Sequence, residues 1–380
     1  MNKVLMILPR YIPIIGGAEV QCRRLINELK KNKDINVIGV VTRRIDSTLS
    51  RRAKVDEVDV TRLPPAGTSI LSEYVFCLLL SLYLIIKKNR YDVIHCHASS
   101  IFGITCSLVG SILHKNVFVK VSTNGEVKAM QNTKLKKMLT QYSSRRCTYI
   151  ALNEEGYDEV KSNIKNARVK LIPNGIDFTK DHSLDAEKGR LFRSELYKKY
   201  GEDILISVFV GRFVERKGIN ELCQAAAAFN NNKKIVFVLV GDASLQRDAI
   251  SVKNIPSDNI LAVGRQENVF PFLFAADIFI SPSHQEGLPN TVIEALSVGK
   301  KCLLSDIWPH RELWEEHSNN ILLFHTGCVA SIIEQLGLIF DIVKNSASRN
   351  ENNILLSKYS ISNVAKEYAQ LYKDKVNAVR

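Results

Sequence analysis

Two carboxylates, Glu286 and Glu294, lie eight positions apart in the segment SHQEGLPNTVIEALSVGK (283–300). The apolar run DIFISPS (277–283) directly before it is typical of a buried strand, so Glu286 would lie in the loop after that strand. Glu294 would lie about one turn into the next helix, where its apolar neighbours do not fit a purely solvent-exposed position. A carboxylate accepts two hydroxyl hydrogen bonds, so Glu294 can hold the two hydroxyls of a ribose.

The same segment predicts a helix N-terminus beside the first carboxylate. Proline suits the first turn of a helix, where its missing N–H has no partner, and glycine often follows a helix end. Pro289 and Gly299 therefore delimit a predicted helix of residues 289–298. The positive end of this helix and the backbone amides of residues 287–291 can hold a phosphate oxygen.

Two cations follow a second apolar run. The run ILISVFVG (204–211) leads into GRFVERKG (211–218), which supplies Arg212 and Lys217. Because these side chains are five residues apart across a turn, they can converge on one pyrophosphate, the arginine as a bidentate fork and the lysine as a point charge. With a helix N-terminus, they can stabilise a departing phosphate without a metal ion.

We expect neither a divalent metal nor a cofactor. No Asp-x-Asp follows an apolar run, and the closest acidic pairing, DEVD (56–59), lies in a predicted charged loop. The tripeptide HCH (95–97) ends a predicted strand, but the sequence nearby offers no further metal ligands, so we expect His97 to be structural or to face a substrate.

A glycine pair follows the first predicted strand. In GGAE (16–19), Gly16 and Gly17 open a helix, so the backbone there can approach a phosphate or a sugar. The pair belongs to neither a G-x-G-x-x-G fingerprint nor a P-loop, which argues against dinucleotide-binding and P-loop proteins.

Short apolar runs alternate with helical segments along the whole chain. Many of these runs are nearly continuous in apolar residues, as strands covered on both faces are. We therefore predict an α/β protein of two tandem Rossmann-like domains, each a doubly wound parallel sheet, that face a central cleft and bind ligands at the carboxyl ends of strands. The predicted strands are residues 3–9, 35–42, 91–97, 116–123, 148–153, 169–175, 204–211, 234–242, 259–264, 277–283, 301–306 and 320–324.

The predicted domain boundary follows LIPNGID (171–177), where the segment FTKDHSLDAEKGR is polar and lacks an apolar period. The first domain would span residues 1–176 and the second residues 177–359. An amphipathic helix within residues 360–380 would return to the first domain.

Five motifs make the chain resemble glycosyltransferase family 4, in the order and over essentially the whole length of that family. They are GGAE, NGID (174–177), VGRFVERKGI (210–219), VGD (240–242) and SPSHQEGLPNTVIEALSVGK (281–300). Members of the family are retaining, nucleotide-sugar-dependent enzymes with two Rossmann-like domains, the B-type fold. The resemblance implies a one-step, same-face displacement through an oxocarbenium-like state.

The resemblance also assigns roles to residues. It implies that Glu286 faces the donor sugar, that Glu294 holds the ribose, and that Arg212 and Lys217 bind the diphosphate. Glu286, Arg212 and Lys217 are the expected catalytic residues. The expected donor site comprises Gly16, Gly17, Arg212, Lys217, Gly241, Arg265, Gln266, Glu286, Gly287, Leu288, Pro289, Asn290, Thr291 and Glu294.

The first half departs from a frequent pattern of the family. Many members carry Thr-x-His after the fourth strand, whereas KVSTNGEVK (120–128) has Asn124 where that histidine is expected. The departure puts a histidine role at this position in doubt. The expected acceptor-binding residues are His97, Lys120, Thr123, Asn124 and Glu126.

Positive charge is concentrated in the first half of the chain. Residues 1–175 hold 28 Lys and Arg against 14 Asp and Glu, whereas the remaining residues hold 24 against 25. The segment SILSEYVFCLLLSLYLIIKK (69–88) has an apolar stretch of 13 residues, too short to span a bilayer. Together these features predict peripheral association with an anionic membrane, unless the helix only packs on its sheet. No helix-turn-helix, zinc-finger or RNP pattern indicates nucleic-acid binding.

Cysteine usage and the N-terminus predict a cytoplasmic protein, on the inner face of the cell membrane if it binds lipid. The eight cysteines are dispersed and form no CxxC pair, which fits buried thiols in a reducing compartment. The start MNKVLMILPRYIP lacks a small-residue cleavage site and is typical of a first strand rather than a signal peptide.

These features predict a retaining hexosyltransferase of cell-surface polysaccharide biosynthesis (O-antigen, capsule or exopolysaccharide). It would move a hexose or N-acetylhexosamine from a nucleotide-sugar, in particular a UDP-sugar, to a saccharide acceptor that is lipid-linked through a polyprenyl chain. Two alternatives stay open. One is a UDP-sugar 2-epimerase of the same architecture, and the other is a catalytically silent nucleotide-sugar-binding subunit, which Asn124 would allow.

Overall fold

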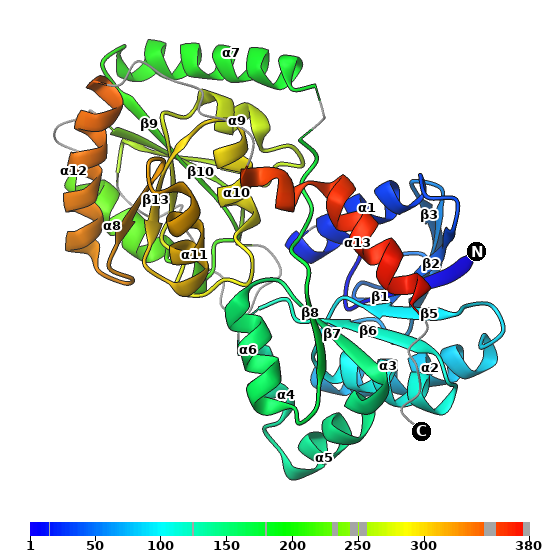
Figure 1. Ribbon diagram of the computed structural model, residues 1–380. Helices are drawn as coiled ribbons and strands as arrows, with labels where there is room; N and C mark the ends of the chain where they lie inside the picture. The colour runs from blue at the N-terminus through cyan, green and yellow to red at the C-terminus, as the bar shows by residue number, and fades with distance from the viewer. Residues whose placement is uncertain are drawn as a thin grey trace. The chain divides into compact units, whose positions relative to one another are not determined.

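The computed structural model describes residues 1–14, 16–123, 125–178, 181–229, 235–243, 250, 257–345 and 355–374. It divides into two compact units, which Figure 1 shows. Unit 1 comprises Met1–Asp177 with Lys358–Arg380, and unit 2 comprises Phe178–Ser357. The boundaries expected from the sequence, after residues 176 and 359, lie within two residues of these.

Unit 1 is built on an eight-stranded sheet in the order β3-β4-β2-β1-β5-β6-β7-β8. Neighbouring strands run parallel, except for β3 and β4, which are antiparallel. The strands are β1 (Asn2–Leu8), β2 (Ile35–Arg43), β3 (Arg52–Val55), β4 (Val58–Leu63), β5 (Val93–Cys96), β6 (Asn116–Lys120), β7 (Cys147–Ala151) and β8 (Arg168–Leu171).

Helices cover both faces of this sheet. Buried residues of α1 and α13 form a core with one face, and buried residues of α2, α3, α4 and α6 form a second core with the other, against which α5 also packs. The helices are α1 (Gly17–Leu29), α2 (Ile70–Ile86), α3 (Ile101–Ile112), α4 (Glu126–Met130), α5 (Lys134–Ser143), α6 (Glu154–Asn163) and α13 (Ile361–Lys373). The helix predicted near the chain's end is therefore present, and it packs on α1.

Unit 2 is built on a six-stranded sheet in the order β11-β10-β9-β12-β13-β14, in which neighbouring strands run parallel. Helices α8 and α12 share a core with one face, and α10 and α11 lie on the other side (Figure 1). The strands are β9 (Leu205–Val210), β10 (Ile235–Val240), β11 (Ile260–Gly264), β12 (Ile278–Ser281), β13 (Lys301–Ser305) and β14 (Ile321–Phe324). The helices are α7 (Ser183–Tyr200), α8 (Ile219–Ala228), α9 (Phe270–Ala275), α10 (Asn290–Ser297), α11 (Trp308–His317) and α12 (Val329–Asn345).

Both sheets are wound in the same way. Numbered along the chain, the strands of unit 2 have the order 3-2-1-4-5-6 of a doubly wound fold. In unit 1, the six neighbouring strands β4-β2-β1-β5-β6-β7 follow the same order. The predicted fold class of parallel α/β domains is therefore confirmed. The strand order reverses between β1 and β5 in unit 1 and between β9 and β12 in unit 2. Ligands of such folds bind outside the carboxyl ends of the strands at these switch points.

One sequence interpretation was wrong at the edge of unit 1. The segment DEVD, predicted to be a charged loop, forms the turn of the β3–β4 hairpin and the first residues of β4. Asp56 and Glu57 have φ values of +47° and +64° and make the tight turn. The Asp56 carboxylate accepts hydrogen bonds from the Arg23 guanidinium of α1, so it serves to hold the hairpin.

At the start of unit 2, α7 begins inside the polar segment after residue 177, in which the sequence analysis found no apolar period. This helix packs on α9 through Gly189, where an added Cβ would lie 2.7 Å from the Phe274 Cβ. Arg193 also donates to the Ala275 carbonyl oxygen at 2.9 Å. Because a glycine and a guanidinium make these contacts, no apolar period marks the helix in the sequence.

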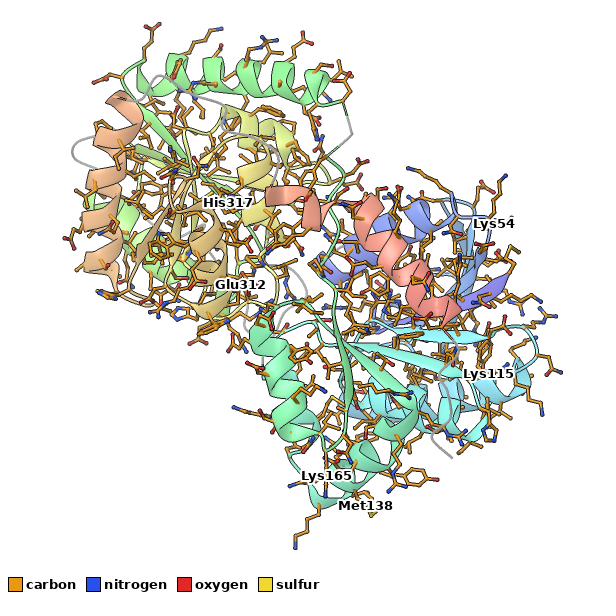
Figure 2. The ribbon with its side chains drawn as sticks, in the orientation of Figure 1. Lys54, Lys115, Met138, Lys165, Glu312 and His317 are labelled. Carbon is orange, nitrogen blue, oxygen red and sulfur yellow. The ribbon has the colours of Figure 1, made fainter. Side chains whose placement is uncertain are left out.

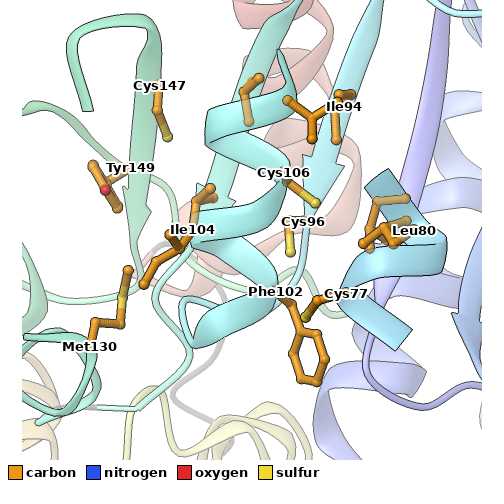
Figure 3. Close-up of a cluster of buried hydrophobic side chains, with 14 of the residues drawn as sticks. Cys77, Leu80, Ile94, Cys96, Phe102, Ile104, Cys106, Met130, Cys147 and Tyr149 are labelled. Atoms are coloured by element: carbon orange, nitrogen blue, oxygen red, sulfur yellow. The ribbon is translucent and has the colours of Figure 1, made fainter. Parts of the chain in front are cut away.

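The predicted unpaired thiols are confirmed. All eight cysteines are free, and each except the half-buried Cys328 is buried. Figure 3 shows Cys77, Cys96 and Cys106 among the apolar side chains where α2 and α3 pack on β5. Burial raises the pKa of the Cys147 thiol to about 12, so this group behaves as a small apolar side chain.

Candidate active site

Two loops meet at the switch point of unit 2. The loop after β9 carries Arg212 and Lys217, and the loop after β12 carries Glu286. Because β9 and β12 are neighbours, residues about 70 positions apart in sequence reach the same edge of the sheet. A backbone hydrogen bond of 2.9 Å from the His284 N–H to the Arg216 carbonyl oxygen joins the two loops.

Two glycines allow the close approach of the backbone segments that follow β9, β10 and β12. Gly218 has φ +65°, and an added Cβ would lie 2.0 Å from the Pro282 carbonyl oxygen of the other loop. Gly241, which follows β10, has φ +148°, and an added Cβ would lie 1.8 Å from the Gly211 carbonyl oxygen. Both positions therefore require glycine, for space as well as for backbone conformation.

Lys217 and Glu286 form a buried ion pair. The Lys217 ammonium donates to Oε1 of Glu286, and the Ser283 hydroxyl donates to the same oxygen at 2.8 Å. Nη1 of Arg216 lies 3.9 Å from the other carboxylate oxygen. Only 16% of the Lys217 side chain and 10% of the Glu286 side chain are exposed, so water and salt screen the pair weakly.

Opposing effects set the protonation of this pair. Burial would raise the pKa of the Glu286 carboxyl, but the charge and hydrogen bond of Lys217, helped by Arg216, bring it below its ordinary value. Burial lowers the pKa of the Lys217 ammonium, Glu286 partly offsets this, and the charges of Arg216 and Arg212 lower it further. Glu286 is thus kept as a carboxylate, and Arg212 lies close enough to act on Lys217.

A buried histidine that the sequence analysis missed belongs to the same network. The Ser305 hydroxyl donates to the Ser283 carbonyl oxygen at 2.5 Å and lies 3.1 Å from Nδ1 of His310. Nδ1 also lies 2.9 Å from the Ser305 carbonyl oxygen, which fits a proton on Nδ1. Burial lowers the pKa of His310 to about 4, against the opposing effect of Glu286, so the imidazole is neutral. Its Nε2 has no hydrogen-bond partner among the residues that the structure describes.

The predicted helix after Glu286 is present as α10, with Pro289 at the N-cap, one position before the expected first turn. Gly287, Leu288 and Pro289 are buried, whereas residues 290–291 are partly exposed. Gly299 has φ +73° and follows the helix, as predicted. The start of α10 therefore lies in the loop that carries Glu286, at the carboxyl end of β12.

Glu294 lies one turn inside α10 and is 5% exposed. Its apolar neighbours in sequence are all buried, so the expectation that it would not face solvent is confirmed. The neighbours are Val292, Ile293, Ala295 and Leu296.

The remaining donor-site candidates of unit 2 follow β10 and β11, the two strands on the outer side of β9. The N–H of Gly241 donates to the Gly264 carbonyl oxygen at 2.9 Å, which joins the ends of β10 and β11. Arg265 and Gln266 follow β11, two strands from β9, and both are exposed. The Gln266 amide donates to the Val263 carbonyl oxygen at 3.0 Å.

The glycine pair of unit 1 lies where the sequence predicted, at the start of α1. Gly16 is the N-cap and Gly17 is the first helical residue, at the carboxyl end of β1. The Glu19 side chain fills the space beside them, since a Cβ added to Gly16 would lie 2.5 Å from its Oε2. Arg10 lies 3.7 Å from the other oxygen of this buried carboxylate.

The acceptor candidates lie at or just after the carboxyl ends of β5 and β6. His97 and Lys120 are 2% and 5% exposed, and the Lys120 ammonium donates to Oδ1 of Asn174 at 2.6 Å. Burial lowers the pKa of Lys120 to about 8. Glu126 begins α4 and accepts a hydrogen bond from the Ser122 N–H at 3.1 Å. Thr123 is partly exposed, and Asn124 lies outside the described residues.

Two stacked imidazoles lie beside these candidates. The rings of His95 and His97 are 4.1 Å apart, and Nδ1 of His95 lies 2.6 Å from the Tyr372 hydroxyl of α13. Within the described part of the chain, Nε2 of each histidine and the Tyr368 hydroxyl are buried without a hydrogen-bond partner. Burial holds the pKa of both histidines well below its usual range, so both are neutral.

Two features do not occur among the described residues. No three His, Cys, Asp or Glu side chains gather there as metal ligands would. Nor does any helix of the described ranges have the length and apolar character needed to cross a membrane.

Two family models match the chain. The model described as Glycosyltransferase Family 4 matches residues 15–180, and the model described as Glycosyl transferases group 1 matches residues 205–341. The first match lies in unit 1 apart from its last few residues, and the second lies in unit 2.

Curated relatives match most of the chain. UDP-Gal:alpha-D-GlcNAc-diphosphoundecaprenol alpha-1,3-galactosyltransferase of Escherichia coli is 28% identical over 320 residues, which cover 78% of this chain and 79% of the relative. The capsular polysaccharide biosynthesis glycosyltransferase CapH of Staphylococcus aureus is 22% identical over 294 residues, which cover 74% and 75%.

A solved structure matches the whole architecture. The sucrose-phosphate synthase (tll1590) from Thermosynechococcus elongatus superposes with a TM-score of 0.79 over 98% of both chains. At 18% identity, this likeness shows the fold alone.

Proposed function

Since the chain belongs to glycosyltransferase family 4, we propose that it is a retaining, metal-independent enzyme that transfers a hexose or N-acetylhexosamine from a UDP-sugar to a lipid-linked saccharide acceptor. The product would serve the biosynthesis of a cell-surface polysaccharide such as O-antigen, capsule or exopolysaccharide.

The observation that carries this proposal is the buried contact between Lys217 and Glu286 at the switch point of unit 2. A buried carboxylate that shares its surroundings with Lys217, Arg216 and Arg212 can meet both parts of a nucleotide-sugar. The cations suit a diphosphate, and the carboxylate suits sugar hydroxyls.

The proposed donor site adds α10 to this contact. The N-terminus of α10 lies in the Glu286 loop and offers amides and positive potential to the diphosphate. The Glu294 carboxylate would accept hydrogen bonds from the ribose hydroxyls. Gly241, Arg265 and Gln266 at the ends of β10 and β11 would line the base.

In the proposed reaction, the bond between the anomeric carbon and the diphosphate oxygen breaks while an acceptor hydroxyl oxygen bonds to the same face of that carbon. The hydroxyl proton passes to the departing phosphate oxygen. Arg212 and Lys217, with the start of α10, stabilise the charge on that phosphate, which is the role that a divalent metal has in other transferases. Glu286 holds the sugar through its hydroxyls.

The chemistry of the donor and acceptor is proposed from the E. coli relative, whose name specifies a UDP-sugar donor and a diphosphoundecaprenol acceptor. Unit 1 would bind the acceptor through His97, Lys120, Thr123, Asn124 and Glu126. Neutral imidazoles and a largely buried lysine suit a hydroxyl-rich ligand of this kind.

A transfer assay tests the proposal. The purified protein is incubated with radiolabelled UDP-sugars and a membrane extract without added metal and with a chelator, and label in the lipid phase is counted. The proposal predicts lipid-phase label with at least one donor, and an α-linkage if the donor is an α-linked UDP-sugar. Epimerisation at C2 would instead establish a UDP-sugar 2-epimerase. Donor binding with neither transfer nor hydrolysis would indicate a silent binding subunit.

A further inference from the structure

One face of α2 is apolar and exposed to solvent. Leu71, Tyr74, Leu78, Leu82 and Ile85 recur at intervals of three and four residues, so they form one stripe along the helix. Between 46% and 73% of each of these residues is exposed. The opposite face of α2 supplies the side chains that pack into unit 1. The side chains of the stripe therefore take no part in the core of unit 1.

A second exposed stripe runs along α5. Leu135, Met138 and Tyr142 have the same helical spacing and are each 61–62% exposed. Figure 2 shows Met138 at the outer edge of unit 1, pointing away from it. Helix α3 contacts both α2 and α5, and its C-terminal Ile112 is 70% exposed. The two stripes and Ile112 therefore belong to one helical layer, and we call them the α2–α5 face.

The chain around this face is strongly basic. Residues 69–153 hold eleven Lys and Arg but only three acidic residues, Glu73, Asp92 and Glu126. Of these, Glu73 pairs with Arg43 and Glu126 is hydrogen-bonded inside unit 1. Lys134 and Lys137 are exposed beside the apolar stripe of α5. A face that combines apolar stripes with excess positive charge complements a surface whose outer layer is anionic and whose interior is apolar.

From this combination we propose that the α2–α5 face docks on an anionic lipid bilayer. The apolar side chains would enter the boundary between headgroups and acyl chains, the tyrosines would lie at headgroup level, and the lysines would meet lipid phosphates. A second copy of this chain is a poorer occupant, because it would place like charges opposite each other. The docking goes beyond the proposed function. Only its biological role rests on that function, since a lipid-linked acceptor lies in such a bilayer.

Vesicle co-sedimentation of the full chain, without donor or acceptor, tests the docking. We expect the protein to sediment with vesicles that contain phosphatidylglycerol at low salt, and to bind vesicles of phosphatidylcholine alone much more weakly. High salt should release it, because salt screens the attraction to lipid phosphates.

Matched variants separate the apolar and the charged contributions. Leu78→Ser with Leu82→Ser should weaken vesicle binding about tenfold or more, since two apolar side chains no longer enter the bilayer. Leu184→Ser with Leu191→Ser is the control, because these leucines of α7 are at least as exposed, at 69% and 62%, but lie in unit 2. This control should bind vesicles as the wild type does.

Two lysines of α5 are tested in the same way. Lys134→Gln with Lys137→Gln should weaken binding to anionic vesicles by about fivefold for each cation removed. Lys198→Gln with Lys199→Gln removes two exposed cations from α7 and should have no such effect.

Three results would overturn the docking. They are a wild-type protein that stays in the supernatant with anionic vesicles at low salt, an α7 control that loses as much binding as the α2 variant, and a wild-type dimer that the α2 variant dissociates in the absence of vesicle binding. The last result would assign the face to a second copy. Transfer to a water-soluble acceptor, assayed on the same proteins, reports on the proposed function independently, because these variants lie outside the proposed site.

Discussion

The two sheets share the order 3-2-1-4-5-6 over six strands, but the carboxyl ends of these strands differ in electrostatic character. At the edge of unit 2, the Glu286 carboxylate lies against Lys217 and Arg216, and the charge of Arg212 acts on Lys217. At the edge of unit 1, two stacked neutral histidines lie beside one buried lysine, Lys120, whose pKa is lowered to about 8. Beside β12, unit 2 thus holds a buried carboxylate among cations, whereas beside β5 unit 1 holds neutral imidazoles and a lysine whose charged form burial disfavours.

This difference indicates how two doubly wound sheets in one chain can bind two kinds of ligand. Keeping charge buried is costly unless a partner is present, so a cationic edge held together by one carboxylate is prepared for a further anion. Neutral imidazoles with unfilled hydrogen-bonding capacity suit hydroxyl groups instead. The contrast supports the proposal of a diphosphate-bearing donor on unit 2 and a sugar acceptor on unit 1.

The largest effect on activity should come from Glu286→Gln, which removes the buried carboxylate that distinguishes the β12 end in unit 2 from the β5 end in unit 1. We expect the transfer rate to fall by about 100-fold to 1,000-fold, because the amide no longer balances the surrounding cations or accepts as strongly from sugar hydroxyls. UDP affinity should change little. Glu215→Gln, an exposed carboxylate of the neighbouring loop, is the control and should keep full activity. An active Glu286→Gln enzyme would refute the assigned role.

The next largest effect concerns the ion pair itself. Lys217→Met leaves a buried carboxylate without its principal partner, and we expect it to lower the free energy of unfolding by about 3–5 kcal/mol. The double variant Lys217→Met with Glu286→Gln removes both charges and should recover most of this loss. Denaturant unfolding of the two single variants and the double variant measures the coupling. Additive losses would show that the pair does not act as a unit.

A smaller effect compares nucleotide binding by the two edges. Glu294→Ala should weaken UDP binding by about tenfold to 100-fold, since two hydrogen bonds to the ribose are lost. Lys120→Met, which keeps the length of a buried side chain of unit 1, should leave UDP binding unchanged and raise the KM for the acceptor. Calorimetric titration with UDP and steady-state kinetics check both. Loss of UDP affinity in Lys120→Met alone would reverse the assignment of the edges.

The smallest effect is a pH dependence of stability from His310. Its pKa is about 4 in the folded protein, below the ordinary value of 6.5, so between these values the unfolded chain binds a proton that the folded chain does not. The free energy of unfolding should therefore fall as the pH is lowered from 6.5 towards 4, by up to about 1.4 kcal/mol per pH unit for this group. His310→Asn should make that fall shallower in unfolding curves at pH 7, 6 and 5. An unchanged slope would show that His310 titrates as an exposed histidine does.

The sequence predicted most of what lies next to a strong local pattern. Apolar runs located the buried strands, and Pro289 with Gly299 located α10 to within one residue. Lys217 and Glu286 could be singled out because each follows a buried strand. That they touch depends on β9 and β12 being neighbours, which follows once the doubly wound order is assumed.

What the sequence did not reveal depends on contacts between distant segments. His310 joins the Glu286 network through Ser305, at the end of β13, and Ser283, in the loop after the neighbouring strand β12. Helix α7 packs through Gly189 and Arg193 and so shows no apolar period. The β3–β4 hairpin is short and has a charged turn, so it resembled a loop. In each case, a tertiary contact decides what local propensity leaves open.

The most direct test of the central claim is a crystal structure of the protein with UDP bound. The account predicts that the diphosphate lies against Lys217, Arg212 and the N-terminus of α10, with the ribose hydroxyls on Glu294. A diphosphate bound against Lys120 and His97 of unit 1 would contradict it.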